Sequence, residues 1–209
     1  IYFYDVPNAK QSVLRFGYPA PKVTDEDYYA ATVMNYRLGG GGFASQLTQQ
    51  LREGKGYTYG IRSGFRGNDK VGSFSISSGV RSNVTSESAE LVKDILENYG
   101  ENFDSTDLEV TKGYTLKSGA RAFETLNAKL NMLSNISNYG FDDDYAKQRE
   151  AIVKKLTVED IKALANKYIK PNQMIYLVVG DAATQLDKLE GLGFGKAILL
   201  NGRDTYLKQ

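Results

Sequence analysis

The sequence contains no histidine and no cysteine, and these two absences remove several kinds of active site. Without cysteine there are no disulfides and there is no thiol nucleophile. Without histidine a serine triad lacks its general base, and a zinc site lacks the ligands that such sites mostly use. No run of acidic residues is spaced as in a calcium-binding loop. A paired-carboxylate hydrolase stays open, because any two of the 25 acidic side chains can meet in a fold.

The chain also lacks a strong net charge and a long apolar run. Its 26 basic and 25 acidic side chains nearly cancel, so no global field draws it to nucleic acid or to anionic lipid. Its apolar runs fall well short of the roughly 18 residues that a membrane span needs. No basic-then-apolar leader opens the chain, and a start at Ile1 favours a piece of a longer protein.

Hydrophobic spacing places strands at both ends of the chain and helices in the middle. The predicted strands are 2–4, 12–18, 57–65, 71–80, 174–179 and 197–200. The predicted helices are 24–38, 43–52, 126–136, 142–155 and 157–168, with two more that start near residues 85 and 106. This order does not fit a βαβ alternation. It predicts an α+β fold in one domain, 1–209, with a mainly antiparallel sheet and a helical layer packed on one face.

Several local features are predicted from short patterns. In strand 57–65 simple alternation places Tyr57, Tyr59 and Ile61 on one face. In strand 71–80 it places Phe74 and Ile76 opposite the serines 73, 75 and 77. Two Thr-x-x-acid patterns, at 106–109 and 157–160, predict capped helix starts. The four consecutive glycines 39–42 are expected to end the helix that precedes them.

Arg52 and Tyr59 form the candidate binding pair. An Arg at the end of a short helix and a Tyr at the start of the next strand can converge across the Gly-rich connection between them. Both side chains donate hydrogen bonds, and donors aimed at a peptide carbonyl stabilise the charge that develops on its oxygen. Two plainer readings remain: Arg52 caps the C-terminus of its helix, and Tyr59 is half-buried in the packing of the sheet.

The glycines Gly39, Gly40, Gly41 and Gly42 do not form a phosphate-binding loop. A helix precedes them rather than a strand, and no Lys-Ser/Thr follows them. Two interpretations stay open. The segment is either a helix stop with a hinge, or a stretch of backbone that admits an extended peptide.

The segment 38–60 resembles the insulinase/pitrilysin family of inverted zinc metallopeptidases, which includes mitochondrial processing peptidase. It is most similar to the C-terminal half of that family, the half without zinc. The pattern Leu-Gly-Gly…Phe-x-Ser-x-Leu…Leu-Arg-Glu-x-x-Gly-x-x-Tyr matches in order and spacing. Residues 11–13 resemble the early Gln-Ser strand, and 178–181 with 192–195 resemble the closing strand and turn. The chain departs from the family at Gln46, where an Arg often precedes the Leu.

The resemblance implies a substrate-binding, non-catalytic half that closes around an extended peptide with a zinc-bearing half. That other half supplies a His-x-x-Glu-His helix, its zinc and the general base. Arg52 and Tyr59 correspond to the family's Arg/Tyr pair near the scissile carbonyl, and glycines 39–42 to a loop that touches substrate. This chain then holds no cofactor, and it is inactive alone because it has no His for zinc.

The expected partners are a peptide substrate and the zinc-bearing half, as a domain of the same polypeptide or as a separate subunit. The main alternative is a non-proteolytic scaffold subunit on the same fold, like the processing-peptidase-related subunits of respiratory complexes. A third option is a plain peptide-binding module that uses a sheet edge. By analogy a periplasmic or secreted setting is favoured. The sequence leaves the substrate, the cleavage preference and the oligomeric state open.

Overall fold

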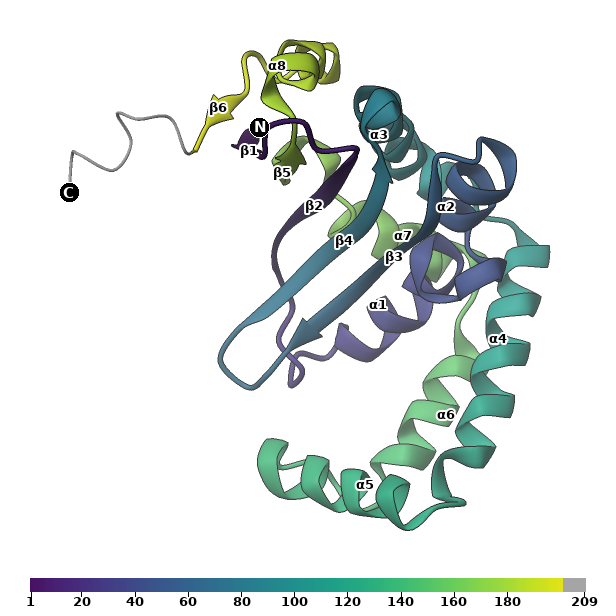
Figure 1. The fold of residues 1–209 in the computed structure, drawn as a ribbon. Coiled ribbons are helices and arrows are strands. Elements are labelled where there is room, and N and C mark those ends of the chain that lie inside the picture. Colours follow the sequence, from purple (N-terminus) through teal and green to yellow (C-terminus); the bar gives the residue numbers. More distant parts are fainter. Residues whose placement is uncertain (201–209) are drawn as a thin grey trace.

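The computed structural model describes residues 1–200, except the side chains of Ala120 and Ala122. The last nine residues of the predicted domain 1–209 therefore lie outside the described part. A six-stranded sheet forms the centre of the molecule, with the strand order β3-β4-β2-β5-β1-β6 (Figure 1). The strands are β1 (Tyr2–Asp5), β2 (Gln11–Ala20), β3 (Thr58–Gly67), β4 (Gly72–Arg81), β5 (Ile175–Gly180) and β6 (Ile198–Leu199).

The sheet is mixed, and its long strands are antiparallel. Strand β4 runs antiparallel to both β3 and β2, and β2 runs antiparallel to β5. Strand β1 runs parallel to β5 and to the short edge strand β6. The predicted α+β class with a mainly antiparallel sheet is therefore confirmed.

Eight α-helices accompany the sheet in the described part of the chain: α1 (Tyr28–Asn35), α2 (Gln46–Thr48), α3 (Thr85–Asn102), α4 (Ser105–Ala120), α5 (Leu126–Tyr139), α6 (Tyr145–Lys155), α7 (Val158–Tyr168) and α8 (Ala182–Gln185). Helices α1, α3 and α7 pack together and against the sheet. Helices α4 and α6 extend away from it and carry α5 at their far end (Figure 1). No helix within residues 1–200 has both the length and the apolar composition for crossing a membrane.

Alternation along the strands explains why only one face of the sheet is covered. In β4 the side chains of Phe74 and Ile76 are fully buried beneath the helices, while serines 73, 75 and 77 lie on the opposite face. Strand β2 repeats the pattern, with Leu14 and Phe16 buried and Val13 and Arg15 exposed. Because the apolar set has a period of two, the register of pairing decides which residues the open face presents.

One predicted helix start and one predicted helix cap are wrong. The first helix begins at Tyr28 rather than Thr24, because residues 22–27 form turns in which the Lys22 amide donates to the Asp25 carboxylate at 2.9 Å. Helix α4 is capped by Asp104, whose carboxylate accepts from the Asp107 amide at 2.9 Å, and not by the pattern at 106–109. At α7 the predicted capping box between Thr157 and Asp160 is confirmed.

The helical winding that begins at Tyr28 ends within the glycines, as predicted, but it is not a regular α-helix up to that point. After Asn35 the chain continues as a π-helical turn, Tyr36–Gly40, which includes the first two glycines. The helix predicted at 43–52 consists of three short pieces: a 3-10 turn (Gly42–Ala44), α2, and a second π-helical turn (Gln49–Gly54). The segment is thus wound throughout, but never as one regular helix.

The buried hydroxyl of Tyr99 ties α3 to the end of α1. It donates to the Met34 carbonyl at 2.6 Å, and burial raises the pKa of Tyr99 far above its ordinary value. We expect Tyr99→Phe to lower the free energy of unfolding by about 1–2 kcal/mol, because the substitution leaves a buried carbonyl without its donor. Tyr114→Phe is the matched control, since Tyr114 is exposed and stacks on Tyr36 through its ring alone. Equal denaturant midpoints for the two variants would contradict this role of Tyr99.

Candidate functional site

Residues 39–44, the four glycines with Phe43 and Ala44, are called the glycine segment here. Close packing against strand β3 fixes its start. A Cβ atom on Gly39 would lie 2.3 Å from the Ser63 Oγ and 2.7 Å from the Ser63 amide nitrogen. Only glycine fits there, because the backbone of the turn touches the strand directly. Gly42 is needed for a different reason. Its φ of +57° is in the left-handed region, which bends the chain into the turn that carries Phe43.

A partly buried ion pair closes this segment into a loop. Nη2 and Nε of Arg37 lie 2.5 and 2.6 Å from one Oδ1 of Asp107, which is buried at the start of α4. Another guanidinium nitrogen of Arg37 donates to the Ala44 carbonyl. One side chain thus joins the first π-helical turn, the end of the glycine segment and α4. The glycine segment is therefore held at both ends.

Arg52 lies in the second π-helical turn and points to the glycine segment. Its Nε lies 3.3 Å from the Glu53 carboxylate, and its guanidinium carbon lies 4.6 Å from the centre of the Phe43 ring. This ring is 61% exposed, so the stacked pair lies at the surface. In residues 1–200 the Arg52 side chain makes no hydrogen bond to a helix-end carbonyl, so it does not act as the C-terminal cap that the sequence left open. Such π-helical turns are rare and concentrate at functional sites.

A β-bulge at the start of β3 directs Tyr59 outward. The pairing of β3 with β4 shifts register between Thr58 and Ile61, so that Tyr59 and Ile61 lie on opposite faces. The hydroxyl of Thr58 anchors the bulge from below: it lies 2.6 Å from the Gly79 carbonyl oxygen and accepts from the Gly60 amide at 3.0 Å. The inserted residue reverses the alternation of the strand.

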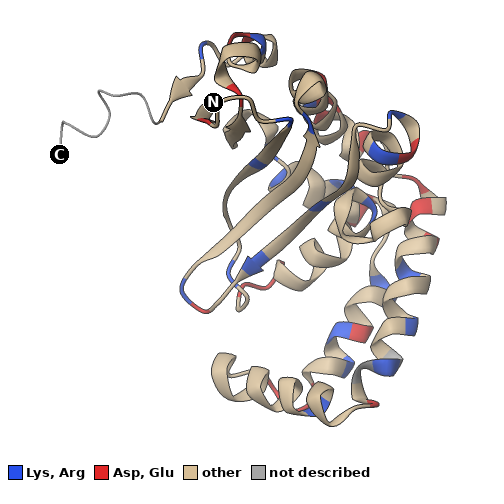
Figure 2. Ribbon diagram, viewed as in Figure 1, with Lys and Arg blue, Asp and Glu red and all other residues tan. Residues whose placement is uncertain are grey.

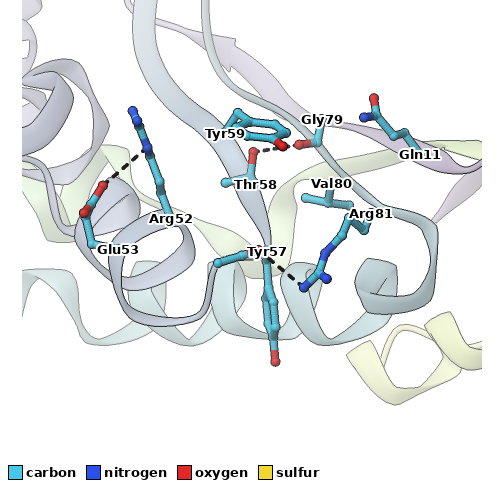
Figure 3. A pocket seen from close by; sticks show the side chains of 10 residues that line it. Gln11, Arg52, Glu53, Tyr57, Thr58, Tyr59, Gly79, Val80 and Arg81 are labelled. Atoms are coloured by element: carbon cyan, nitrogen blue, oxygen red, sulfur yellow. Dashed lines mark hydrogen bonds and ion pairs between the residues drawn. The ribbon is translucent and has the colours of Figure 1, made fainter.

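The prediction that Tyr57, Tyr59 and Ile61 share a face is therefore wrong. Ile61 is buried beneath the helices, whereas Tyr59 is 90% exposed. Tyr59 is also not the half-buried packing residue that the plainer reading expected. Within the described residues its hydroxyl makes no hydrogen bond. Tyr57 points away from Tyr59, to the opposite side of the chain (Figure 3).

The structure brings Arg52 and Tyr59 to one cleft of about 490 Å³ (Figure 3). The cleft lies where the start of β3 meets the end of β4 and the start of β2. Its lining consists of Gln11, Arg52, Glu53, Gly56, Tyr57, Thr58, Tyr59, Gly79, Val80 and Arg81. Gly39, Gly40, Gly41 and Gly42 do not line it, and they reach it only through Phe43, which stacks on Arg52.

Two lining residues, Arg81 and Gln11, were not identified from the sequence. They pair in register at the end of β4 and the start of β2, and Arg81 Nη2 donates to the Gly56 carbonyl at 3.4 Å. The alternation that places serines 73, 75 and 77 on the open face continues to Gly79 and Arg81. That alternation is visible in the sequence. The pairing of β2 with β4, which brings Gln11 beside Arg81, is not.

The donor set of this chain does not fit a zinc ion. It contains no histidine and no cysteine, and no three acidic residues within 1–200 are grouped to hold a metal. A chemical step that needs zinc therefore cannot be built from these residues. What the cleft does offer is a set of hydrogen-bond donors: a guanidinium group, a phenol and a second guanidinium from Arg81.

Comparison with known proteins assigns the family. Residues 1–113 match the family described as the peptidase M16 inactive domain, and the chain belongs to this family. It is therefore a non-catalytic, C-terminal-type domain of the M16 metallopeptidases, and the family that the motif at 38–60 predicted is confirmed. The crystal structure of a peptidase M16 inactive domain from Pseudomonas fluorescens superimposes with a TM-score of 0.79 and 28% identity, over 86% of this chain and 43% of that one.

Two curated relatives have contrasting names. A "non-peptidase homolog YmxG" of Helicobacter pylori is 27% identical over 182 residues, which are 83% of this chain and 40% of that protein. An "uncharacterized zinc protease SCO5738" of Streptomyces coelicolor is 27% identical over 158 residues, or 75% of this chain and 34% of that protein. The chain thus spans less than half the length of the relatives that it matches.

The anchor formed by Arg37 gives a stability prediction. We expect Arg37→Met to lower the free energy of unfolding by about 3 kcal/mol, because it leaves the buried Asp107 carboxylate without its cation. Denaturant titration measures the change. The double variant Arg37→Met/Asp107→Asn should recover part of the loss, because it also removes the uncompensated charge.

Lys154→Met is the matched control. It removes one partner of the exposed i,i+4 pair Lys154–Glu150, where we expect a change of about 0.5 kcal/mol or less. If Arg37→Met were as mild as this control, the ion pair with Asp107 would not be what holds the glycine segment.

Proposed function

We propose that this chain is the substrate-binding, non-catalytic half of a zinc metalloendopeptidase. In this proposal a zinc-bearing half, in the same polypeptide or in a partner subunit, closes with it around an extended peptide. The zinc-bearing half provides the metal and the general base. The observation that carries the proposal is the outward-held phenol of Tyr59 in the same cleft as the guanidinium of Arg52.

Tyr59 has the properties expected of a group that binds a partner from outside this chain. Its side chain is almost fully exposed, yet the bulge beneath it is fixed by the buried hydroxyls of Thr58 and Ser78, which are 3.0 Å apart. Because the Tyr59 hydroxyl has no partner in residues 1–200, a substrate carbonyl can accept from it without the loss of an internal hydrogen bond. Donors placed at the developing oxyanion stabilise the transition state of acyl transfer.

Arg52 supports the same role from the side. Its Nε contacts Glu53 and its plane stacks near Phe43, so the guanidinium is oriented before substrate binds. The two terminal Nη groups make no hydrogen bond among the described residues. They can donate hydrogen bonds to a peptide carbonyl, with the fork geometry that distinguishes Arg from Lys. Arg52 is thereby assigned to positioning of the peptide.

We assign the glycine segment a supporting role in the same proposal. Gly39, Gly40 and Gly41 pack closely on their own chain, whereas Gly42 has open space around it. The turn from Gly42 to Ala44 presents Phe43 to the solvent beside Arg52. Contact of this segment with substrate would therefore come through Phe43 and the backbone of Gly42.

A scaffold role on the same fold is the second candidate. It is favoured by one relative, whose printed name calls it a non-peptidase homologue. A scaffold has no use for an exposed phenol that a β-bulge turns into a cleft, and for this reason we place it second. The two candidates differ in whether the hydroxyl of Tyr59 affects a reaction.

The proposal predicts a kinetic defect for Tyr59→Phe in the assembled enzyme. We expect kcat to fall by about 10²-fold, within the range for loss of one oxyanion donor, while KM changes little because the hydroxyl acts mainly in the transition state. Turnover of a fluorogenic peptide by the assembled protein measures both constants. Circular dichroism should show no change, because the lost hydroxyl has no partner within residues 1–200.

Tyr4→Phe is the matched control, since Tyr4 is an exposed tyrosine on β1 that does not line the cleft. We expect its kcat to equal that of the wild type. A wild-type kcat for Tyr59→Phe would contradict the assigned role. Absence of any peptidase activity in the assembled protein, with normal assembly of both tyrosine variants, would favour the scaffold.

A further inference from the structure

The face of the sheet that the helices leave open carries positive charge without negative charge. Its three long strands, β2, β3 and β4, contain Arg15, Arg62, Arg66 and Arg81 and no Asp or Glu. Figure 2 shows blue segments along these strands and no red ones. All four arginines are exposed and have the strand parity of the open face. The near-zero net charge of the chain conceals this local excess.

Strand register groups these arginines on one surface. Arg15 and Arg62 both pair with Ser77, from opposite sides, so they lie two strands or about 10 Å apart. Arg66 lies four residues farther along β3, and Arg81 four residues beyond Ser77 along β4, at the cleft. The four arginines therefore form a positively charged patch that begins at the candidate site and continues over the open face. We call Arg15, Arg62 and Arg66 the arginine face.

The arginine face lacks partners of its own. Among residues 1–200, no ion pair involves Arg15, Arg62 or Arg66, and their guanidinium groups make no hydrogen bonds. Three other arginines have partners in the structure. Arg37 pairs with Asp107, Arg52 with Glu53, and Arg149 packs on the ring of Tyr29.

The floor between the arginines consists of small residues, and no packing contact at Gly64 or Gly79 requires them to be small. A Cβ atom on Gly64 or on Gly79 would meet nothing within 4 Å, and neither glycine has a positive φ. Glycine weakens a strand, and in strand interiors it often marks a place where a ligand or another backbone approaches closely. Serines 73, 75 and 77 complete this low, flat floor.

We propose that the arginine face binds acidic side chains of the extended peptide whose scissile bond lies at Tyr59, so that the substrates are peptides with Asp or Glu flanking the cleavage site. The proposal rests on the proposed function, and it adds the substrate class. The Gly/Ser floor admits the peptide backbone, and the unpaired guanidinium groups bind its carboxylates. Arg is well suited to this, because its fork matches the geometry of a carboxylate.

The positions of the arginines set where the acidic residues should lie. Arg62 and Arg66 are three and seven residues from Tyr59 along β3. An extended chain advances about 3.3 Å per residue, so these distances correspond to peptide residues about three to seven positions from the scissile bond. The direction in which the peptide runs decides whether they lie before or after that bond, and the test therefore includes both.

The test measures the affinity of the assembled protein, with zinc removed by a chelator, for fluorescent peptides that it then cannot cleave. One pair of peptides carries Glu or Gln at positions three to seven before the bond, and a second pair carries them after it. We expect one Glu peptide to bind about tenfold more tightly than its Gln counterpart at 0.1 M salt, as three exposed ion pairs together would give. At 1 M salt, where the Debye length is about 3 Å, this preference should largely vanish.

The triple variant Arg15→Gln/Arg62→Gln/Arg66→Gln should lose the preference and bind both peptides with the affinity of the Gln peptide. Its matched control, Lys117→Gln/Lys129→Gln/Lys147→Gln, removes the same charge from exposed sites on α4, α5 and α6 and should keep the preference. Gly64→Val should fold with an undiminished thermal midpoint, because valine suits a strand, and should weaken binding of both peptides by obstructing the floor.

Equal affinities for Glu and Gln peptides, or a preference that survives in the triple arginine variant, would overturn the inference. It would also be overturned if the same arginines bound a DNA oligonucleotide or anionic vesicles while the peptides showed no preference. Failure of the proposed function has a different signature. The zinc-loaded protein would cleave neither peptide, although the preference for Glu and its loss in the arginine variant remained.

Discussion

The β-bulge between Thr58 and Ile61 is the constraint on which the site depends. Without the inserted residue Tyr59 would lie on the same face as Ile61, beneath the helices. With it, the phenol turns to the open side while the rest of β3 keeps its apolar residues in the core. The hydroxyl of Thr58 fixes this arrangement, because it forms hydrogen bonds with the backbone of both β3 and β4. A packed core and an exposed donor are thus obtained from one strand.

The same strand links the cleft to the arginine face. Beyond the bulge the alternation is regular, so Arg62, Gly64 and Arg66 follow on the open side at every second position. The cleft and the open face are therefore two parts of one surface, with Arg81 at their junction. This continuity explains how a chain of nearly zero net charge can still have a locally positive surface.

The fold could be predicted from the sequence where one pattern decided each element. Phe74 and Ile76 against the serines of β4, the capping box at Thr157 and the helical middle of the chain were all readable in this way. The expectation that Arg52 and Tyr59 converge across the Gly-rich connection agrees with the structure, since both line the same cleft, and their role in binding substrate stays a prediction. Each of these signals is local.

What the sequence did not predict depends on contacts between distant segments. The bulge needs the Gly79 carbonyl of the neighbouring strand, and without it Tyr59 reads as an ordinary alternating residue. The ion pair of Arg37 with Asp107 joins residues seventy positions apart, and the passage of the helix through Gly39 depends on its contact with Ser63. The arginine face appears only when strand register brings Arg15 and Arg62 to either side of Ser77.

We propose that the phenol of Tyr59 contacts the scissile carbonyl of a bound peptide. A crystal structure of the assembled, zinc-depleted protein with an uncleaved peptide would measure this contact. We expect a distance of about 2.5–3.0 Å between the Tyr59 hydroxyl and the carbonyl oxygen of the bond that the zinc-loaded protein cleaves. A peptide that is bound with its scissile carbonyl far from Tyr59 would contradict it.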